Sequence, residues 1–523
     1  MARLKEYNGH YCESEYEYAF IEFLEAEGWK YSSGNNISRV TKRDVLIADD
    51  FKKFIADTNP DLTEDEVTQI YDNVRLVGAE SDFATLHKVY GWMVNGVQFT
   101  PQDRLPRMIP LIEFDNWDKN IFRVVNQFTV EYTNNGQKEN RRADVLLFVN
   151  GIPLCVIELK NPADANATIY DAWEQINIRY WRDIPHLLHY CPLACISDGV
   201  KTRLGTVRTP YEHFYAWRRV NEGDVVSTLP FAETETMIKG IYTPERFVEI
   251  FRDYIYFQDS IYDCDEVEIV CRYPQFFAAK LLKQSIVNSV VTRSGKGGTY
   301  FGATGCGKTY TMAFLARQLA LRCTDIPEIG SPTIILIVDR DELQKQGSKL
   351  FTKSKEFLNL GEVSVVKNRT QLRQELGARQ SGGFYICTIQ KFCDREDDKI
   401  GLINDRQNII CFSDEAHRTQ LEHSKKIQFS KDADENMKAM VSKPYAKVLK
   451  EAFPHATFVG FTGTPIAETY QTFGDEIDRY TMDQAVADGL TVSIKYHPRI
   501  AKVLLDNKKV KEITWKETFS EDN

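Results

Sequence analysis

A glycine-rich stretch in the second half of the chain has the residue types that bind phosphate. It reads G-A-T-G-C-G-K-T and matches the pattern G-x-x-x-x-G-K-[ST] at every fixed position. Glycines allow backbone N–H groups to close around phosphate oxygens, while the lysine reaches the β- and γ-phosphates and the threonine hydroxyl ligates Mg²⁺. A chance glycine-rich turn is the alternative. The candidate nucleotide-binding residues are Gly302, Ala303, Thr304, Gly305, Cys306, Gly307, Lys308 and Thr309.

Acidic and hydroxyl-bearing motifs follow this stretch at the ends of apolar runs. Asp414-Glu415-Ala416-His417 ends one run, and Asp414 would hold the Mg²⁺ of a nucleotide while Glu415 polarises the attacking water. Residues 462–465 (T-G-T-P) end the next run and would link the nucleotide state to movement. Residues 339–341 and 388–392 also end apolar runs, with hydroxyls and backbone amides suited to phosphates.

Arg272 and Gln275 precede the first helix expected in this half of the chain. The Gln275 amide has the donor and the acceptor that an adenine edge requires. A helix-capping role for Gln275 remains open. Both residues are counted with the nucleotide-binding candidates.

Three ionisable residues in the first half form a nuclease-like pattern. Asp144 opens the apolar run D-V-L-L-F-V, and Glu158 and Lys160 end the run L-C-V-I-E-L-K. Residues two apart in a strand share a face, and the turn at Asn150-Gly151 brings the two strands together. Two converging carboxylates favour Mg²⁺, which would hold a phosphate and acidify a water that Lys160 orients or helps deprotonate. The alternative is a solvated sheet face, because matches to a pattern such as D-x₁₃-E-x-K arise often by chance in a chain with 75 acidic residues.

Gln175 lies on the helix that follows and is a further catalytic candidate. Tyr180 is five residues further on, and at that spacing two residues do not share the face of an α-helix, whereas Gln175 and Arg179 do. Ordinary polar and core positions are the alternative for Gln175 and Tyr180.

The elements that carry these residues indicate an α/β protein of two sheet domains. We expect a helix over residues 13–29 and polar helices over 30–120. An antiparallel meander is expected over 122–160, with turns at Asn135-Gly136 and Asn150-Gly151. Further helices are expected at 169–181 and 230–262. From about residue 272, helices alternate with apolar strands at 298–301, 333–338, 384–388, 409–413 and 457–461, as in a parallel sheet with crossover helices. The motifs fall at the carboxyl ends of these strands, where open α/β sheets bind ligands.

Composition limits which partners and which cellular location are expected for the chain. The chain has 523 residues, 43% hydrophobic and 27% charged, with a net charge of −10, so a nucleic-acid site would have to be a local patch. Its 11 cysteines include no C-x-x-C pair and several lie in apolar runs, which indicates buried free thiols and a cytoplasmic protein. The sequence has no run of 18 apolar residues and no signal-peptide pattern at its start, so we expect no association with a membrane.

With these residues in view, the chain resembles the restriction subunit, the motor and endonuclease, of a type I restriction–modification enzyme. The resemblance covers nearly the whole chain and implies a D…E-x-K nuclease domain (residues 1–260) and a first RecA-like ATP-binding lobe (261–485). It implies the cofactors ATP and Mg²⁺, Asp144 and Glu158 as metal ligands at one site, and Thr309 and Asp414 at the other. It also implies ATP-driven translocation and cleavage of double-stranded DNA by a type I site-specific deoxyribonuclease, with modification and specificity subunits as partners. The family carries a Gln–Tyr pair at four-residue spacing, whereas Tyr180 here lies one residue later.

The family pattern also contains a second RecA-like lobe with an arginine-bearing motif. We expect residues 486–523 to be only the start of that lobe, and the 523-residue chain therefore to bind ATP with little turnover. Two other functions remain open: a repair helicase–nuclease outside restriction, and a DNA- and partner-binding subunit whose nuclease is inactive.

Overall fold

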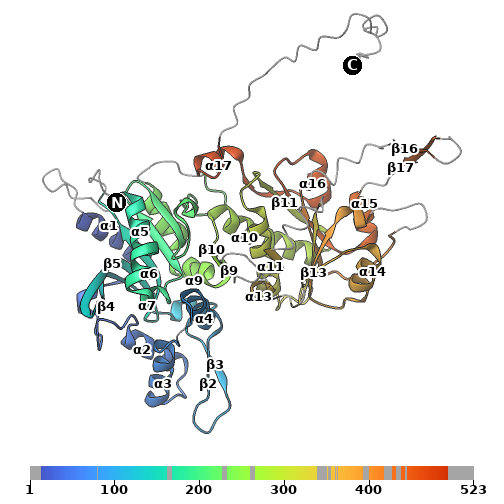
Figure 1. Cartoon of the computed structure of the whole chain (residues 1–523). Helices are drawn as coiled ribbons and strands as arrows, with labels where there is room; N and C mark the ends of the chain where they lie inside the picture. The colour runs from blue at the N-terminus through green and yellow to red at the C-terminus, as the bar shows by residue number, and fades with distance from the viewer. Residues whose placement is uncertain are drawn as a thin grey trace, which may run out of the picture.

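The structure is a computed structural model that describes residues 13–78, 80–161, 168–225, 232–258, 266–338, 350–351, 355–359, 361, 363–392, 400–416, 427–431, 437–441 and 445–492. Two sheet domains lie side by side, joined by α9 (Pro244–Asp253) and the hairpin of β9 (Ile255–Gln258) and β10 (Val267–Val270) (Figure 1). Buried apolar side chains from both domains form one continuous cluster. The expectation of helix throughout 230–262 is wrong near its end, where the short apolar run I-Y-F forms β9 instead.

The first domain is built on a six-stranded mixed sheet with the order β1-β4-β5-β6-β7-β8. Only β1–β4 and β6–β7 pair in parallel, and the other neighbours are antiparallel. This confirms the predicted meander. The strands are β1 (Lys30–Ser33), β4 (Phe122–Asn134), β5 (Gln137–Val149), β6 (Ile152–Leu159), β7 (Leu193–Ser197) and β8 (Thr202–Thr206).

Two tight turns fix the register of the meander. Asn135 and Gly136 have φ of 50° and 81°, and Asn150 and Gly151 have φ of 51° and 76°. Positive φ at both central residues defines the hairpin turn whose twist matches the flanking strands. Both turns lie where the sequence predicted them.

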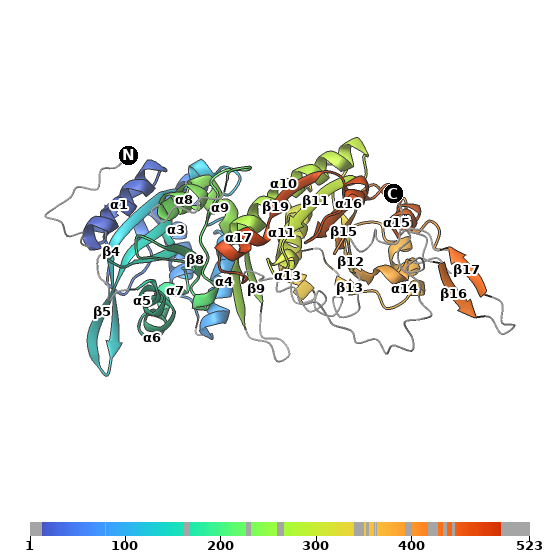
Figure 2. The same ribbon diagram turned by 90° about the horizontal axis from the view of Figure 1, so that it is seen from above.

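Helices cover both faces of this sheet (Figure 2). On one face, Tyr16 of α1 (Glu13–Ala26) contacts the Ser197 hydroxyl at 2.7 Å, and α1 packs against α8 (Ala232–Ile241). On the other lie α5 (Ile169–Glu174), a π-helical segment (Gln175–Tyr180), α6 (Trp181–Asp183) and α7 (Pro185–Leu188). The segment between these helices and the second domain includes a short 3₁₀ turn, Tyr211–His213.

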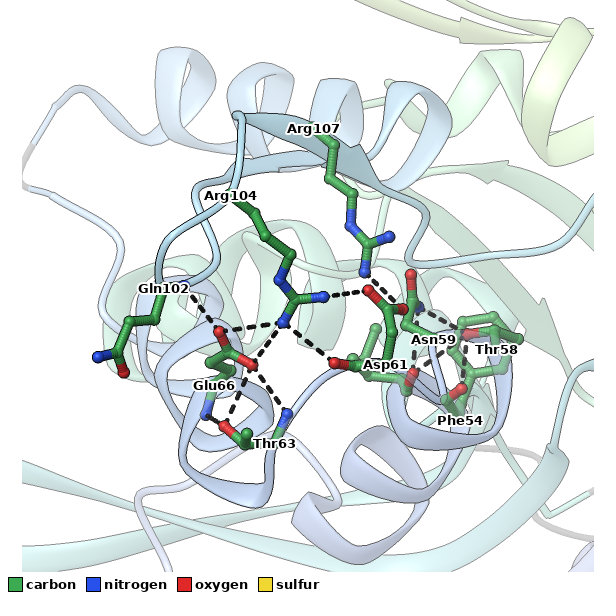
Figure 3. Close-up of polar contacts among 10 residues, drawn as sticks. Phe54, Thr58, Asn59, Asp61, Thr63, Glu66, Gln102, Arg104 and Arg107 are labelled. Atoms are coloured by element: carbon green, nitrogen blue, oxygen red, sulfur yellow. Dashed lines mark hydrogen bonds and ion pairs between the residues drawn. The ribbon is translucent and has the colours of Figure 1, made fainter.

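The region between residues 30 and 120 is only partly helical, in contrast to the prediction. It holds α2 (Ala48–Thr58), α3 (Glu64–Arg75) and α4 (Asp82–Asn95), but also β1 and the hairpin of β2 (Val97–Phe99) and β3 (Arg107–Ile109). Glu66 caps α3 by accepting from the Thr63 backbone N–H at 2.8 Å, as its sequence pattern predicts. The same carboxylate accepts from the Gln102 backbone N–H at 2.8 Å and pairs with Arg104 (Figure 3). These contacts fasten the β2–β3 hairpin to α3.

The second domain is built on a seven-stranded, fully parallel sheet with the order β13-β14-β12-β15-β18-β11-β19. The five predicted strands are confirmed, and the two that were missed, β13 and β19, are the edge strands. The strands are β11 (Lys296–Gly302), β12 (Thr333–Val338), β13 (Val363–Val365), β14 (Phe384–Thr388), β15 (Ile409–Asp414), β18 (Thr457–Thr462) and β19 (Glu476–Tyr480).

Most crossovers of this sheet contain an α-helix, as expected for parallel strands. These helices are α11 (Lys308–Arg322), α13 (Lys355–Leu358), α14 (Arg369–Ala378), α15 (Tyr445–Ala452) and α16 (Ala467–Phe473). In the described residues the connection from β14 to β15 contains a 3₁₀ turn (Ile389–Lys391), while α10 (Tyr273–Thr292) precedes the first strand and α17 (Met482–Ala487) follows the last. A separate two-stranded pair is formed by β16 (Ile427–Lys431) and β17 (Met437–Val441).

Two expectations from composition can be compared with the described residues. All eight cysteines recorded there are buried free thiols, as predicted. None of the described helices is both long and apolar enough to cross a membrane.

Candidate active sites

Asp144 and Glu158 lie opposite each other on neighbouring antiparallel strands. Val145 of β5 pairs with Ile157 of β6, so the next residues in register are Asp144 and Glu158. Directly opposed residues share a face of the sheet. The Asp144 carboxylate also accepts a hydrogen bond from the Leu159 backbone N–H at 3.0 Å. The two carboxylates therefore meet on one face of the sheet, on its two central strands, β5 and β6.

Two side chains from the helix beneath the sheet hold the Glu158 carboxylate. Gln175 Nε2 donates to Glu158 Oε2 at 2.6 Å, and the Tyr180 hydroxyl donates to Oε1 at 2.6 Å. Glu158 is fully buried. Both oxygens are thus fixed in direction, and each retains a lone pair for a further ligand.

Lys160 joins the same network through Gln175. The Lys160 ammonium donates to Gln175 Oε1 at 3.0 Å, while Gln175 Nε2 also donates to the Tyr180 hydroxyl at 2.9 Å. Lys160 is anchored by its own backbone N–H, which donates to Ser197 O on β7 at 2.8 Å. The structure therefore brings Asp144, Glu158, Lys160 and Gln175 into one site.

The expectation that Gln175 and Tyr180 cannot share a helix face is wrong. Residues Gln175–Tyr180 form a π-helix, in which the backbone hydrogen bonds span five residues in place of four. The wider turn places residues five apart on one side of the helix. π-Helical turns are frequent at functional sites, and a Gln–Tyr spacing of five residues is the signal that could have indicated one.

The charges and burial of this site are suited to binding a cation. Burial, followed by the proximity of Asp144, raises the pKa of Glu158 well above its usual range. Burial and the adjacent Glu158 likewise raise the pKa of Tyr180, so its hydroxyl remains a donor. Mg²⁺ is bound in proteins by one or two carboxylates together with waters and phosphate oxygens, and Asp144 and Glu158 match that donor set. No cluster of three or more His, Cys, Asp or Glu residues suited to a metal occurs among the described residues.

The predicted phosphate loop lies between β11 and α11. Gly305 and Gly307 have φ of 82° and 85°, a conformation that glycine adopts without strain. Gly307 is the N-cap of α11, which runs to Arg322, so the positive end of that helix faces the loop. The Lys308 ammonium lies 3.2 Å from Gly302 O, within the loop itself.

Asp414 and Glu415 face the loop from the end of β15. The Lys308 ammonium lies 3.8 Å from Glu415 Oε1, and Asp414 Oδ1 accepts from the Glu415 backbone N–H at 3.0 Å. Burial raises the pKa of Asp414 to about 6, and Lys308 offsets part of that rise. Glu415 has a positive φ of 48°, which is uncommon outside glycine and is found at constrained sites. This part of the predicted site is therefore assembled around Lys308.

The other predicted strand-end motifs have mixed outcomes. Gly463, after β18, packs against the phosphate loop, since a Cβ there would lie 3.3 Å from Gly302 O and from Thr304 Oγ1. The loop at 388–392 ends β14, as predicted, in a 3₁₀ turn. His417 and residues 339–341 lie outside the described residues.

Arg272 and Gln275 take the place expected at the start of α10. Gln275 Oε1 accepts from the Arg272 backbone N–H at 2.9 Å, which is the capping role that remained open. Its Nε2 atom lies 3.4 Å from Gly307 O. Gln275 thus caps α10 and contacts the phosphate loop at the same time, and its amide keeps one proton and one lone pair for a ligand.

Comparisons with known proteins agree with the two halves of this architecture. Residues 11–213 match the family model described as type I restriction enzyme R protein N terminus, and residues 274–523 match the SWI2/SNF2 ATPase model. The type I restriction enzyme HindI endonuclease subunit of Haemophilus influenzae is 30% identical over 92% of this chain and 46% of its own length. The SauCOLORF180P endonuclease subunit of Staphylococcus aureus is 25% identical over 79% of this chain and 41% of its own length.

Together the fold and these matches define a mixed-sheet domain, similar to the N terminus of type I restriction enzyme R proteins, fused to a parallel-sheet lobe of the SWI2/SNF2 ATPase type. The chain is a homologue of the endonuclease subunits of type I restriction enzymes, and it spans about half the length of the curated relatives that it matches. A solved structure of the type ISP restriction–modification enzyme LlaBIII bound to DNA is 16% identical over 43% of this chain and 16% of its own, with a TM-score of 0.28.

Proposed function

We propose that this chain provides the nuclease and ATP-binding parts of an ATP-dependent type I restriction endonuclease. The main observation in favour is that one chain carries two assembled sites: opposed carboxylates with a lysine on one sheet, and a phosphate loop facing an Asp–Glu pair on the other. In this role the chain translocates and cleaves double-stranded DNA. Its partners are the modification and specificity subunits, in the cytoplasm.

In the nuclease site, Asp144 and Glu158 are the side chains that would hold Mg²⁺, which when bound would supply charge for a phosphate oxygen and acidity for a water. Gln175 and Tyr180 keep both oxygens of Glu158 in position through their 2.6 Å hydrogen bonds. Lys160, oriented by Gln175, contacts the scissile phosphate or the attacking water. The intact hydrogen bonding of this network favours an active nuclease over an inactive binding subunit.

In the motor lobe, the amides of residues 302–309 and the Lys308 ammonium bind the nucleotide phosphates. Thr309 and Asp414 are the side chains that would hold a nucleotide-bound Mg²⁺, and Glu415 would orient the attacking water. Lys308 lies within reach of both the loop carbonyl and Glu415, so it can bridge phosphates and the acidic pair.

Paired variants test this assignment on the purified chain. Glu158→Ala should abolish Mg²⁺-dependent DNA cleavage and leave ATP binding unchanged, while Lys308→Ala should abolish ATP binding. Loss of both properties in Glu158→Ala, with a changed far-ultraviolet circular dichroism spectrum, would instead indicate misfolding. Cleavage that survives both Asp144→Ala and Glu158→Ala would refute the nuclease assignment.

A further inference from the structure

A cavity of about 430 Å³ lies beside the phosphate loop, at the junction of the two domains. Pockets that bind small molecules usually measure about 300–1,000 Å³. The cavity is lined by the segment that follows β8, by the β10 strand, and by the starts of α10 and α11, including Tyr215, Glu268, Arg272, Gln275 and Tyr310. It therefore joins residues of the nuclease domain to residues of the ATPase lobe.

The cavity is continuous with the phosphate loop. Gln275, in its wall, contacts Gly307 O at 3.4 Å, and Tyr310 directly follows the loop residue Thr309. A nucleotide with its phosphates on the loop would therefore have its base close to this cavity.

One wall of the cavity is a stacked pair. The Arg272 guanidinium lies 3.6 Å from the centre of the Tyr215 ring. Tyr215 is held in place by backbone hydrogen bonds in both directions with Leu204 of β8, at 2.8 and 3.0 Å. A flat surface of this kind is suited to stacking with a purine base.

A second wall carries a buried carboxyl group. Glu268 is 4% exposed, and among the described residues neither of its side-chain oxygens has a hydrogen-bond partner. Burial raises the pKa of Glu268 well above its usual range, with Thr206 and Arg208 offsetting part of the rise. A buried polar group without a hydrogen bond destabilises the folded protein, so a ligand with a hydrogen-bond donor would be stabilised here.

We propose that Tyr215 and Glu268 are nucleobase-contacting residues: Tyr215 stacks with the base, and Glu268 accepts a hydrogen bond from its exocyclic amino group. The proposal deepens the proposed ATP-binding function and rests on it. Neither residue belongs to a motif of the ATPase lobe. Tyr215 belongs to the nuclease-domain side of the junction. A nucleotide bound at this site would therefore contact the nuclease domain and help to hold it in position.

The stacking role is tested by binding of Mg·ATP and of inorganic tripolyphosphate, measured by titration calorimetry on the full chain. Base stacking is worth about 1–3 kcal/mol, so Tyr215→Ala should weaken ATP binding roughly 5- to 150-fold and leave tripolyphosphate binding unchanged. Tyr215→Phe keeps the ring and should bind ATP like the wild type, as should Tyr211→Ala, which removes a nearby ring that does not line the cavity. Unchanged ATP binding in Tyr215→Ala, or equal weakening of both ligands, would overturn the stacking role.

The hydrogen bond is tested with purine riboside triphosphate, which lacks the 6-amino group of ATP. Wild-type protein should prefer ATP by roughly 3- to 10-fold, as expected for one net hydrogen bond, and Glu268→Leu should lose that preference. A wild type without the preference, or a Glu268→Leu variant that keeps it, would exclude this contact. Failure of the proposed function has a different signature: neither ATP nor tripolyphosphate would bind to the wild type, or both would bind to Lys308→Ala as to the wild type.

Discussion

Gln175 and Tyr180 lie five residues apart on one helix and donate hydrogen bonds to the two oxygens of a single carboxylate, Glu158. A regular α-helix would turn these side chains apart, and the π-helix over Gln175–Tyr180 brings them together. The helical irregularity is therefore what completes the proposed nuclease site, because Glu158 is fully buried and its direction is set by these two donors.

Tyr180→Phe should reduce DNA cleavage without unfolding the protein. The change removes the hydroxyl that donates to Glu158 Oε1 and leaves the ring in the core. Groups that orient a metal ligand typically contribute about 10- to 100-fold in metal affinity or activity. The measurement is the cleavage rate as a function of Mg²⁺ concentration, where we expect a higher half-saturating concentration.

Tyr170→Phe is the matched control, since Tyr170 is 47% exposed at the start of the same helical segment. It should cleave at the wild-type rate. Equal rates for Tyr180→Phe and wild type at all Mg²⁺ concentrations would mean that the Tyr180 hydroxyl does not position Glu158.

Much of the fold and of the sites could be predicted from local sequence. The central strands of the second sheet are continuous apolar runs because helices cover both of their faces. The opposition of Asp144 and Glu158 could be predicted because the Asn150-Gly151 turn fixes the hairpin register.

The parts that could not be predicted depend on irregular geometry or on tertiary contacts. The edge strand β19, E-I-D-R-Y, is polar because only one of its edges is paired, so it lacks an apolar run. A π-helix has no hydrophobic period that distinguishes it from an α-helix over six residues. The pairing of Tyr215 with Arg272 joins segments of different domains, and no local pattern indicates it.

The two hairpin turns of the meander should respond very differently to the same substitution. Gly136 and Gly151 both have positive φ, so an alanine costs roughly 1–2 kcal/mol at either position from backbone strain alone. At Gly151 the added Cβ would also lie 2.2 Å from Ile47 O, whereas at Gly136 nothing lies within 4 Å. Gly151→Ala should therefore destabilise the protein by about 1–3 kcal/mol more than Gly136→Ala.

Urea unfolding followed by tryptophan fluorescence measures this difference. The midpoint for Gly151→Ala should lie clearly below that for Gly136→Ala. Equal midpoints would mean that the Asn150-Gly151 turn does not pack against the start of α2 in solution.

A buried ion pair joins the segment after β8 to the edge of the second sheet. Arg219 contacts both carboxylate oxygens of Asp478 on β19, at 2.9 and 3.1 Å, and the two side chains are 5% and 9% exposed. Removing one member of such a pair leaves a buried charge and typically costs about 3–5 kcal/mol. Arg219→Ala should therefore lower the free energy of unfolding by that amount.

Two controls separate the ion pair from a general effect of losing a charge. Lys53→Ala breaks a pair with Asp57 in which both side chains are more than 60% exposed, and it should change stability by less than about 1 kcal/mol. The double variant Arg219→Met, Asp478→Leu should recover most of the loss, since it leaves no unpaired buried charge. A double variant as unstable as Arg219→Ala would contradict this account.

His186 should make the stability of the first domain depend on pH in the mildly acidic range. Burial, together with the nearby positive charges of Arg43 and His189, lowers the pKa of His186 to about 4. Its Nε2 atom is buried and has no hydrogen-bond partner in the part of the chain that the structure describes. His186 and Arg43 line a surface pocket, and the other charged groups that line it are Glu139, Arg141, Arg182 and Asp183. Because an unfolded histidine titrates near 6.5, the unfolded chain binds the proton more tightly than the folded one. The stability contributed by neutral His186 is thus complete above about pH 6.5 and is lost as the pH falls toward 4, by about 2–3 kcal/mol.

The free energy of unfolding of His186→Gln should fall less between pH 7.5 and 5 than that of the wild type. His455→Gln, which replaces an exposed histidine, should follow the wild type. A His186→Gln variant whose stability falls as steeply as the wild type would show that His186 is not held neutral by its surroundings.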